Sequence, residues 1–137
     1  MSIVNYEQGF DPDVSLASKS ARVAPPSDPV EYLRANPNLR VESVDERTIG
    51  GAPAVDVVVT GLSGQRGSKY LNKRLDGPGA RCAAIVYNSF FSPVTPVGHT
   101  ERLIFFDVGR RHFLIENLSP EPSEKTEQLL DSIKFGS

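Results

Sequence analysis

The chain has 137 residues, a length typical of one domain built around one core. Hydrophobic residues make up 39% of the sequence and charged residues 23%, a composition that argues against disorder throughout. The formal net charge of −2 offers no long-range attraction to a polyanion, which disfavours DNA or RNA as the main partner.

The location of the protein is constrained by its cysteine usage and hydropathy. The only cysteine, Cys82, cannot form an internal disulfide, which suits a reducing compartment. No apolar run approaches about 18 residues, so we expect no membrane span, and the amino terminus lacks the features of a secretory signal. We expect a cytoplasmic protein if the chain is complete, and an extracytoplasmic one if it is a domain of a longer anchored or secreted protein.

The amino-terminal part, residues 1–27, is expected to hold a strand followed by a proline-rich loop or arm. The stretch "SIVNYE" predicts the strand, and one further edge strand around Val14 to Leu16 is compatible with the loop that follows. Residues 28–137 are expected to form a single α+β domain.

A short helix is predicted over "PVEYLRAN" at the start of that domain. Ser27 or Asp28 is a suitable cap, and Pro29 occupies the first turn, where a missing N–H costs little. Pro37 ends the helix, because the residue before a proline is pushed out of the helical region. The residues expected to face the core are Val30, Tyr32 and Leu33.

A hairpin is predicted next, because apolar residues alternate on both sides of Gly50-Gly51. The alternation shifts phase between Val41 and Val44 and resumes at Val55. The two glycines could belong to a turn or to a ligand-binding loop. We favour the turn, because two-residue hairpin turns demand positive φ angles and no helix follows that could hold an anion.

The rest of the chain predicts three more strands and a helix. Residues 61–81 are a loop or a short strand–loop pair, "CAAIVYNSFF" is an apolar strand, and "SPVTPVGH" interrupts it. "ERLIFFDVGRRHFLIENL" predicts a second hairpin. Ser123 caps a last helix, whose expected docking residues are Leu129, Leu130 and Ile133.

The predicted fold class is therefore α+β, with an antiparallel sheet packed against a short N-terminal helix and a C-terminal helix. The strand residues expected to point inward are all apolar, which leaves few groups for a buried catalytic cluster: Val55, Val57, Val59, Ile85, Leu103, Phe105, Phe113 and Ile115.

The order "DPVEYLRANPNLRVESVDERTIGGAPAVDVVV", "ERLIFFDVGRRHFLIENL" and "LLDSIKF" resembles the Mog1/PsbP-like fold over Asp28 to Phe135. It is most similar to uncharacterised actinobacterial domains that are often attached to lipoprotein or membrane anchors. The resemblance implies a non-enzymatic binding or assembly module. Such domains usually open with an extra pair of strands containing a tryptophan, and this chain has none. The chain is then truncated, or its sheet is smaller, or a partner supplies strands at an exposed edge.

Catalytic and metal-binding constellations are weak in the sequence. A Cys–His pair could combine Cys82 with His99 or His112, oriented by Asp107, but Cys82 opens an apolar strand, where free cysteine is usually buried. His112 is better explained as a solvated strand residue, and His99 lies in a Pro/Gly loop. "GLSGQ" lacks the last glycine of a nucleophile elbow. We predict no catalytic, cofactor-binding or metal-binding residues.

A basic cluster follows Gly61 and is the predicted partner-binding site, opposed to the simpler interpretation of a solvated face. Its members are Arg66, Lys69, Tyr70, Lys73, Arg74 and Arg81, where Tyr70 provides an aromatic anchor among cations. We expect a non-catalytic protein-interaction module that binds another protein or associates with itself through a sheet edge. The alternative is a small-ligand or enzymatic domain with a pocket between sheet and helix.

Overall fold

The computed structural model describes residues 2–5, 28–62, 65–66, 81–84 and 94–135. Their elements follow one another in the order β1 (Ser2–Asn5), α1 (Pro29–Ala35), β2 (Leu39–Ile49), β3 (Ala52–Gly61), β4 (Gln65–Arg66), β5 (Arg81–Ala84), β6 (Val94–Pro96), β7 (Thr100–Val108), β8 (Arg111–Leu118) and α3 (Glu124–Asp131).

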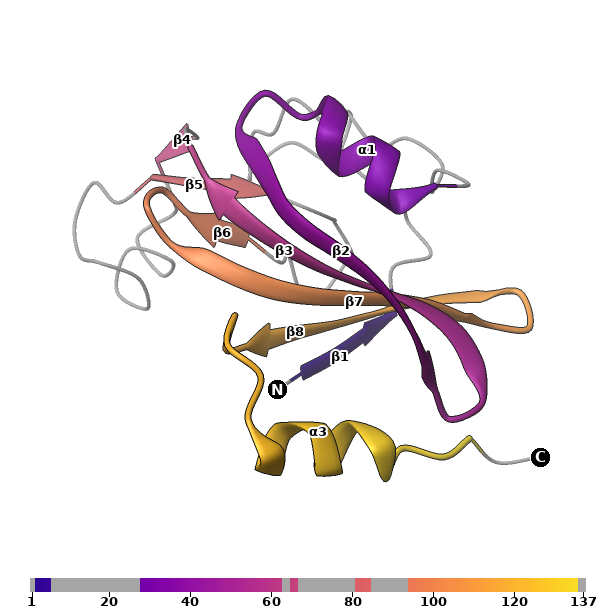
Figure 1. Ribbon diagram of the computed structural model, residues 1–137. Coiled ribbons are helices and arrows are strands. Elements are labelled where there is room, and N and C mark those ends of the chain that lie inside the picture. The colour runs from indigo at the N-terminus through magenta and orange to yellow at the C-terminus, as the bar shows by residue number, and fades with distance from the viewer. Residues whose placement is uncertain (1, 6–27, 63–64, 67–80, 85–93, 136–137) are drawn as a thin grey trace.

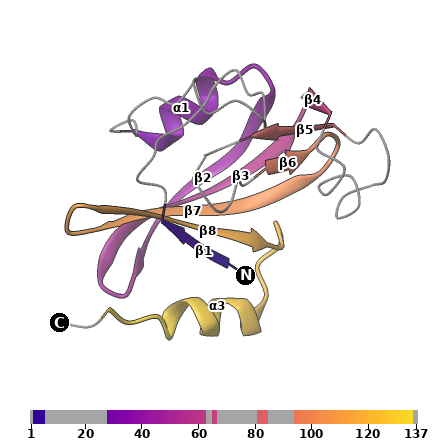
Figure 2. The ribbon, with the colours of Figure 1, turned by 180° about the vertical axis from the view of Figure 1, so that it is seen from behind.

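The strands form two antiparallel sheets. The large one has five strands in the order β1-β8-β7-β3-β2, and the small one has three in the order β4-β5-β6. A parallel bridge between Gly61 and Val97 joins them. Figures 1 and 2 show α1 and α3 on opposite faces of the large sheet. The predicted α+β class, with an antiparallel sheet between a short early helix and a late helix, is confirmed.

Helix α1 begins as its sequence predicts. Oδ1 of the N-cap Asp28 accepts hydrogen bonds from the backbone N–H groups of Val30 and Glu31, at 3.0 and 3.1 Å, and Pro29 stands in the first turn. The helix ends at the C-cap Asn36, directly before Pro37. Its side chain Leu33 is fully buried against the sheet. Val30 and Tyr32, also expected to face the core, are partly buried against the same cluster, so the predicted core face of the helix is confirmed.

The β2–β3 hairpin turns at Gly50 and Gly51, whose φ angles of 56° and 85° fit a type I′ turn. The two-residue turn sets the register from Ile49–Ala52 onward. The expected phase shift is real, because the register slips between Val41 and Ser43. The glycines therefore serve the backbone, as predicted.

Gly50 has a second role that the sequence does not reveal. A Cβ placed on it would lie 2.5 Å from Cε2 of Phe135, so the aromatic ring after α3 packs directly on the turn. Phe135 also contacts Phe106 of β7, with ring centroids 5.5 Å apart. The carboxyl-terminal segment therefore packs against the β2–β3 hairpin at a position where only glycine leaves room for the ring.

Both faces of the large sheet carry a core. The core between the sheet and α1 comprises Leu33, Leu39, Val57, Val59, Leu103, Phe105 and Leu114. The core between the sheet and α3 comprises Ile49, Ala54, Ile104, Phe106, Ile115, Leu118 and Leu130. The predicted inward residues Val57, Val59, Leu103, Phe105 and Ile115 are buried, and Val55 and Phe113 are partly buried.

Two expectations fail. Leu129, expected to dock α3, is 49% exposed, because the helix buries the next residue, Leu130, instead. "SPVTPVGH" does not merely interrupt a strand, since Val94–Pro96 forms β6 at the edge of the small sheet, where a proline is tolerated. Ile85 and the possible strand at 14–16 lie outside the described residues.

Candidate functional site

Strand β2 is an edge of the large sheet in the described part of the chain. Its half nearest the turn, 43–49, pairs with β3 without irregularity. In an antiparallel ladder, residues that bond to the neighbour alternate with residues whose N–H and C=O point away. The first pair after the two-residue turn, Ile49–Ala52, is hydrogen-bonded, so every second residue of β2 from Ile49 bonds to β3. The residues between them, whose N–H and C=O point away from β3, are Val44, Glu46 and Thr48. These three residues present backbone donors and acceptors to a further strand.

The position of Pro53 agrees with this alternation. Pro53 lies opposite Thr48, in a pair that does not bond across β2 and β3, so its missing N–H removes nothing from that ladder. The β3–β7 ladder starts one residue later, at Ala54–Phe106. The proline therefore fits the register, with its nitrogen turned from β2.

A groove of about 620 Å³ runs beside this edge. The described residues that line it come from both strands of the hairpin: Glu46, Arg47, Thr48, Pro53, Ala54 and Val55. Pro53 and Val55 supply apolar surface, and Glu46 and Thr48 supply polar groups, all on the α1 side of the sheet. The groove is the concave surface into which alternate side chains of an added strand could point.

The other half of β2 is interrupted by the bulge and also carries a charged pair. Nε of Arg40 donates to Oε1 of Glu42 at 2.6 Å, and the hydroxyl of Thr60 donates to the same oxygen at 2.9 Å. These hydrogen bonds lower the pKa of Glu42. Bulges are common protection for an exposed strand edge. Among the described residues, the regular half, 43–49, has no bulge and keeps the even geometry that a further strand needs.

On the α3 face, buried charges hold β2 in place. Nε of Arg102 donates to both carboxylate oxygens of Asp56, at 2.9 and 3.1 Å, and its Nη2 bonds to Oδ2 as well. Its Nη1 forms an ion pair with Oε1 of Glu127 in α3, at 2.7 Å. Nη1 of Arg47 donates to Oε2 of Glu127 at 3.0 Å and reaches Asp56 at 3.4 Å. Strands β2, β3 and β7 are thereby tied to α3.

The pKa values follow from these contacts. Hydrogen bonding to Asp56 outweighs the desolvation of Arg102 and raises the pKa of the guanidinium. Burial opposes the charge on Glu127, but the hydrogen bonds and charges of Arg102 and Arg47 outweigh it, so the pKa of Glu127 is lowered. Together with Asp56 and Arg47, these two groups act as a structural clamp between sheet and helix.

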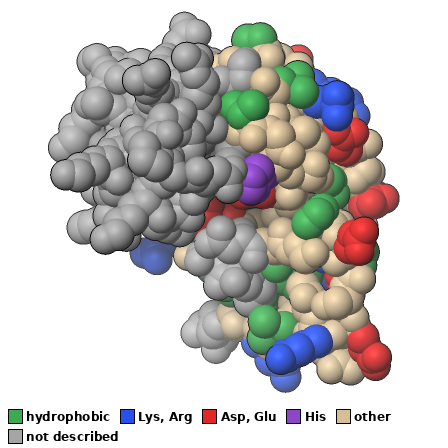
Figure 3. All heavy atoms as spheres, turned by 90° about the vertical axis from the view of Figure 1, so that its left-hand side faces the viewer, with side chains coloured by type: hydrophobic (Ala, Val, Ile, Leu, Met, Phe, Trp, Pro, Cys, Tyr) green, Lys and Arg blue, Asp and Glu red, His purple; other side chains and the backbone are tan. Residues whose placement is uncertain are grey.

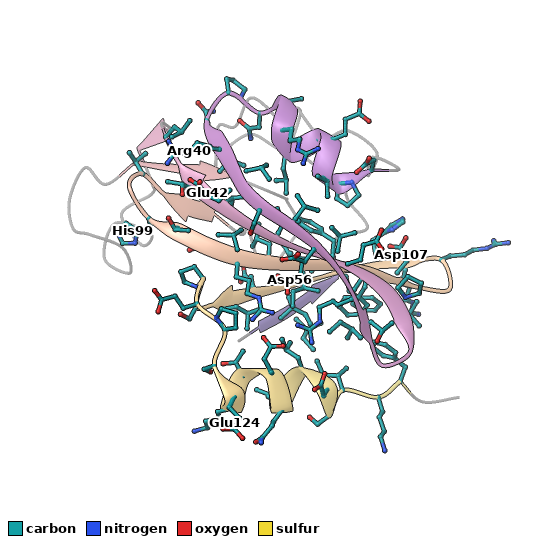
Figure 4. All side chains as sticks on the ribbon, viewed as in Figure 1. Arg40, Glu42, Asp56, His99, Asp107 and Glu124 are labelled. Carbon is teal, nitrogen blue, oxygen red and sulfur yellow. The ribbon has the colours of Figure 1, made fainter. Side chains whose placement is uncertain are left out.

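Two members of the catalytic constellation considered from the sequence, His99 and Asp107, lie far apart. His112 is a partly exposed residue of strand β8, as expected, and its Nδ1 lies 2.6 Å from Oδ1 of Asp107. His99 precedes the opposite end of β7, and a strand of that length puts it roughly 25 Å from Asp107; Figure 4 shows the two labels at opposite ends of the molecule. Cys82 lies in β5 of the small sheet, opposite Pro96, which precedes His99 by three residues.

The predicted basic cluster is only partly within the described residues. Arg66 in β4 and Arg81 in β5 lie directly opposite each other in register, so the fold brings these two together. The other members, Lys69, Tyr70, Lys73 and Arg74, lie outside the described residues. On the side that carries β4–β6, described side chains of both charges are interspersed with scattered apolar ones (Figure 3).

Two features of the site were missed by sequence reasoning. Asp56 interrupts the apolar run "AVDVVV", and Arg102 precedes "LIFF"; charges beside such runs signal a buried ion pair on a sheet covered on both faces. The outward set Val44, Glu46 and Thr48 follows from the glycine turn once β2 is known to be an edge. No sequence pattern identifies that edge.

No known protein family, curated protein or solved structure matches the chain. Within the described segments, no helix has the length and apolar character needed to cross the bilayer. Those same segments hold no group of three or more His, Cys, Asp and Glu side chains placed to bind a metal ion. The resemblance to the Mog1/PsbP-like fold stays a prediction.

Proposed function

We propose that the chain is a non-catalytic protein-interaction module that binds an extended segment of another protein along β2. The observation that carries the proposal is the outward backbone of Val44, Glu46 and Thr48 beside a groove of about 620 Å³. In strand addition, main-chain hydrogen bonds supply affinity and a groove for alternate side chains supplies specificity. A binding role is also what the resemblance to Mog1/PsbP-like domains implies.

The geometry of the regular half suits this role. Seven residues, 43–49, pair without irregularity with β3, so the edge repeats evenly over the length of a typical strand. The clamp of Arg47, Arg102, Asp56 and Glu127 fixes the opposite face. A rigid edge limits the ordering cost of binding to the incoming segment.

The test is a selection of linear peptides from a displayed random library, followed by binding measurements on proline and alanine variants of one residue. Glu46→Pro and Glu46→Ala both remove the side chain, but only the proline removes an outward N–H. Because one hydrogen bond contributes roughly 1 kcal/mol, we expect Glu46→Pro to bind at least roughly fivefold more weakly than Glu46→Ala. The melting temperatures of the two variants should agree within about 5 °C.

Two results would count against this function. One is a library that yields no peptide able to shift the amide resonances of Val44, Glu46 and Thr48. The other is a set of selected peptides that bind the proline and alanine variants equally well.

A second candidate surface is the pair of Arg66 and Arg81. Like charges directly opposite each other in an antiparallel pair are destabilising, and an acidic partner would relieve the repulsion. Reversing Arg66, Lys73 and Arg74 to glutamate should then abolish capture of an acidic peptide such as oligoglutamate without lowering the melting temperature. Unchanged capture would refute a role for the basic cluster.

A further inference from the structure

We propose that the segment bound along β2 carries two successive basic residues, which lie opposite Asp45 and Glu46. This inference rests on the proposed function, because it names the chemistry of the partner for the same edge. It follows from the charges along the regular half of β2, from the groove beside it, and from the symmetry that a second copy of the chain would impose.

Asp45 and Glu46 are exposed neighbours on the edge strand. Successive strand residues point to opposite faces. Glu46 lies opposite Val55 and so faces the groove side, while Asp45 lies opposite Asp56 and so faces α3. No ion pair joins either carboxylate to a residue in the described part of the chain. A strand added here meets one negative charge on each face.

The α3 side of the edge carries excess negative charge. Asp45 and Asp56 are directly opposite each other, at a Cα separation of about 5.5 Å for a hydrogen-bonded antiparallel pair. Two guanidinium groups, of Arg47 and Arg102, stand among four carboxylates, those of Asp45, Asp56, Glu127 and Asp131. The two arginines are engaged with Asp56, Glu127 and Asp131, so a partner opposite Asp45 is favoured when it is cationic.

The residues flanking the two carboxylates extend the pattern. Val44 and Thr48 share the groove side with Glu46, where Pro53 and Val55 provide apolar surface. In the partner, the residues two positions before and two positions after the basic residue opposite Glu46 are therefore β-branched and apolar. The residue opposite Arg47 is small and uncharged. Since the large sheet is antiparallel throughout, an antiparallel strand continues it, and the favoured core sequence is Val-Ser-Lys-Lys-Val.

A second copy of the chain fits this edge poorly. A two-fold contact between β2 strands places the residue at its centre opposite itself. The registers that overlap the regular half most fully are centred on Asp45, Glu46 or Arg47. Each of these sets like charges directly opposite one another, which destabilises an antiparallel pair. The register centred on Glu46 also sets Asp45 opposite Arg47 of the second copy, but that arginine is already paired with Asp56, Glu127 and Asp131. The charges of the edge thus favour a different protein over self-association.

The experiment compares three synthetic peptides by NMR titration of the full chain. Thr-Val-Ser-Lys-Lys-Val-Thr is the basic probe, and the same peptide with Gln-Gln or Glu-Glu in place of Lys-Lys gives the neutral and acidic controls. Two exposed ion pairs correspond to roughly a two- to thirtyfold preference for the basic peptide over the neutral one. Raising NaCl from about 50 mM to about 500 mM should shrink the preference, because added salt screens exposed charges.

Variants assign the preference to the edge. The pair Asp45→Asn and Glu46→Gln should remove the difference between the basic and neutral peptides. Glu42→Gln, on the same strand but already paired with Arg40, is the matched control and should retain it.

The outcomes separate the two proposals. Equal binding of the basic and neutral peptides at Val44, Glu46 and Thr48 would overturn the basic partner and leave strand addition standing. If neither these peptides nor any from the displayed library moves these amides, both proposals fail. A concentration-dependent dimer that shifts the same amides in the free protein would overturn the basic partner in favour of a second copy.

Discussion

The contact between Gly50 and Phe135 predicts that Gly50→Ala destabilises the protein more than Gly51→Ala does. Backbone strain alone predicts the opposite order. Both turn glycines have positive φ, but Gly50, at 56°, lies in the left-handed region that other residues can enter, while Gly51, at 85°, lies outside it. Strain alone therefore makes Gly51→Ala the more costly change, at about 1–2 kcal/mol. Nothing lies within 4 Å of a Cβ on Gly51, so strain is its whole cost.

At Gly50 the added methyl must displace the ring of Phe135, since its Cβ would lie 2.5 Å from the ring. The ring is partly buried against Phe106, so losing its packing costs less than truncating a fully buried phenylalanine, at about 1–2 kcal/mol. Together with strain, Gly50→Ala should lower the free energy of unfolding by about 2–4 kcal/mol.

The assay is urea denaturation of both glycine variants in the wild-type and Phe135→Ala backgrounds. We expect Gly50→Ala to cost more than Gly51→Ala in the wild type. In the Phe135→Ala background the order should reverse, because only strain remains. Equal costs for Gly50→Ala in both backgrounds would refute the reasoning.

Three other changes test the clamp and the first helix. Arg102→Ala should cost about 3–5 kcal/mol in chemical denaturation, because it leaves the carboxylate of Asp56 buried without its main partner; a cost below 1 kcal/mol would contradict a clamp. Because the pKa of Glu127 is lowered in the folded protein, its ionised carboxylate contributes to stability above its pKa in the unfolded state, about 4.3. That contribution is lost as the pH falls through its pKa in the folded state, so Glu127→Gln should flatten the loss of stability below about pH 4.5. An unchanged acid denaturation profile would argue against this assignment. Asp28→Ala should cost about 1 kcal/mol by thermal melting, and Asp28→Ser much less, because serine also caps; equal losses would show that the cap is not what matters.

Local patterns in the sequence predicted the elements well. The caps at Asp28 and Ser123 and the Gly50-Gly51 turn all lie where short-range chemistry places them. The phase shift between Val41 and Val44 correctly indicated an irregularity, because a single extra residue moves every later side chain to the other face.

Long-range features were out of reach. Pairing of Asp56 with Arg102 joins residues 46 positions apart, and the Gly50–Phe135 contact spans the domain, so no local pattern tells which residues are partners. Leu129 and Leu130 are equivalent in composition, and only the placement of α3 decides which one is buried. Whether β2 is an edge strand depends on the strand order, and the strand order cannot be derived from hydrophobic periodicity.

Amide hydrogen exchange along β2 tests the central claim most directly. In the free protein, the amides of Val44, Glu46 and Thr48 should exchange much faster than those of Ser43, Asp45 and Arg47, which face the ladder with β3. Adding the basic probe peptide should slow the fast set and remove the alternation. Uniformly slow exchange of these residues in the free protein would contradict an open edge.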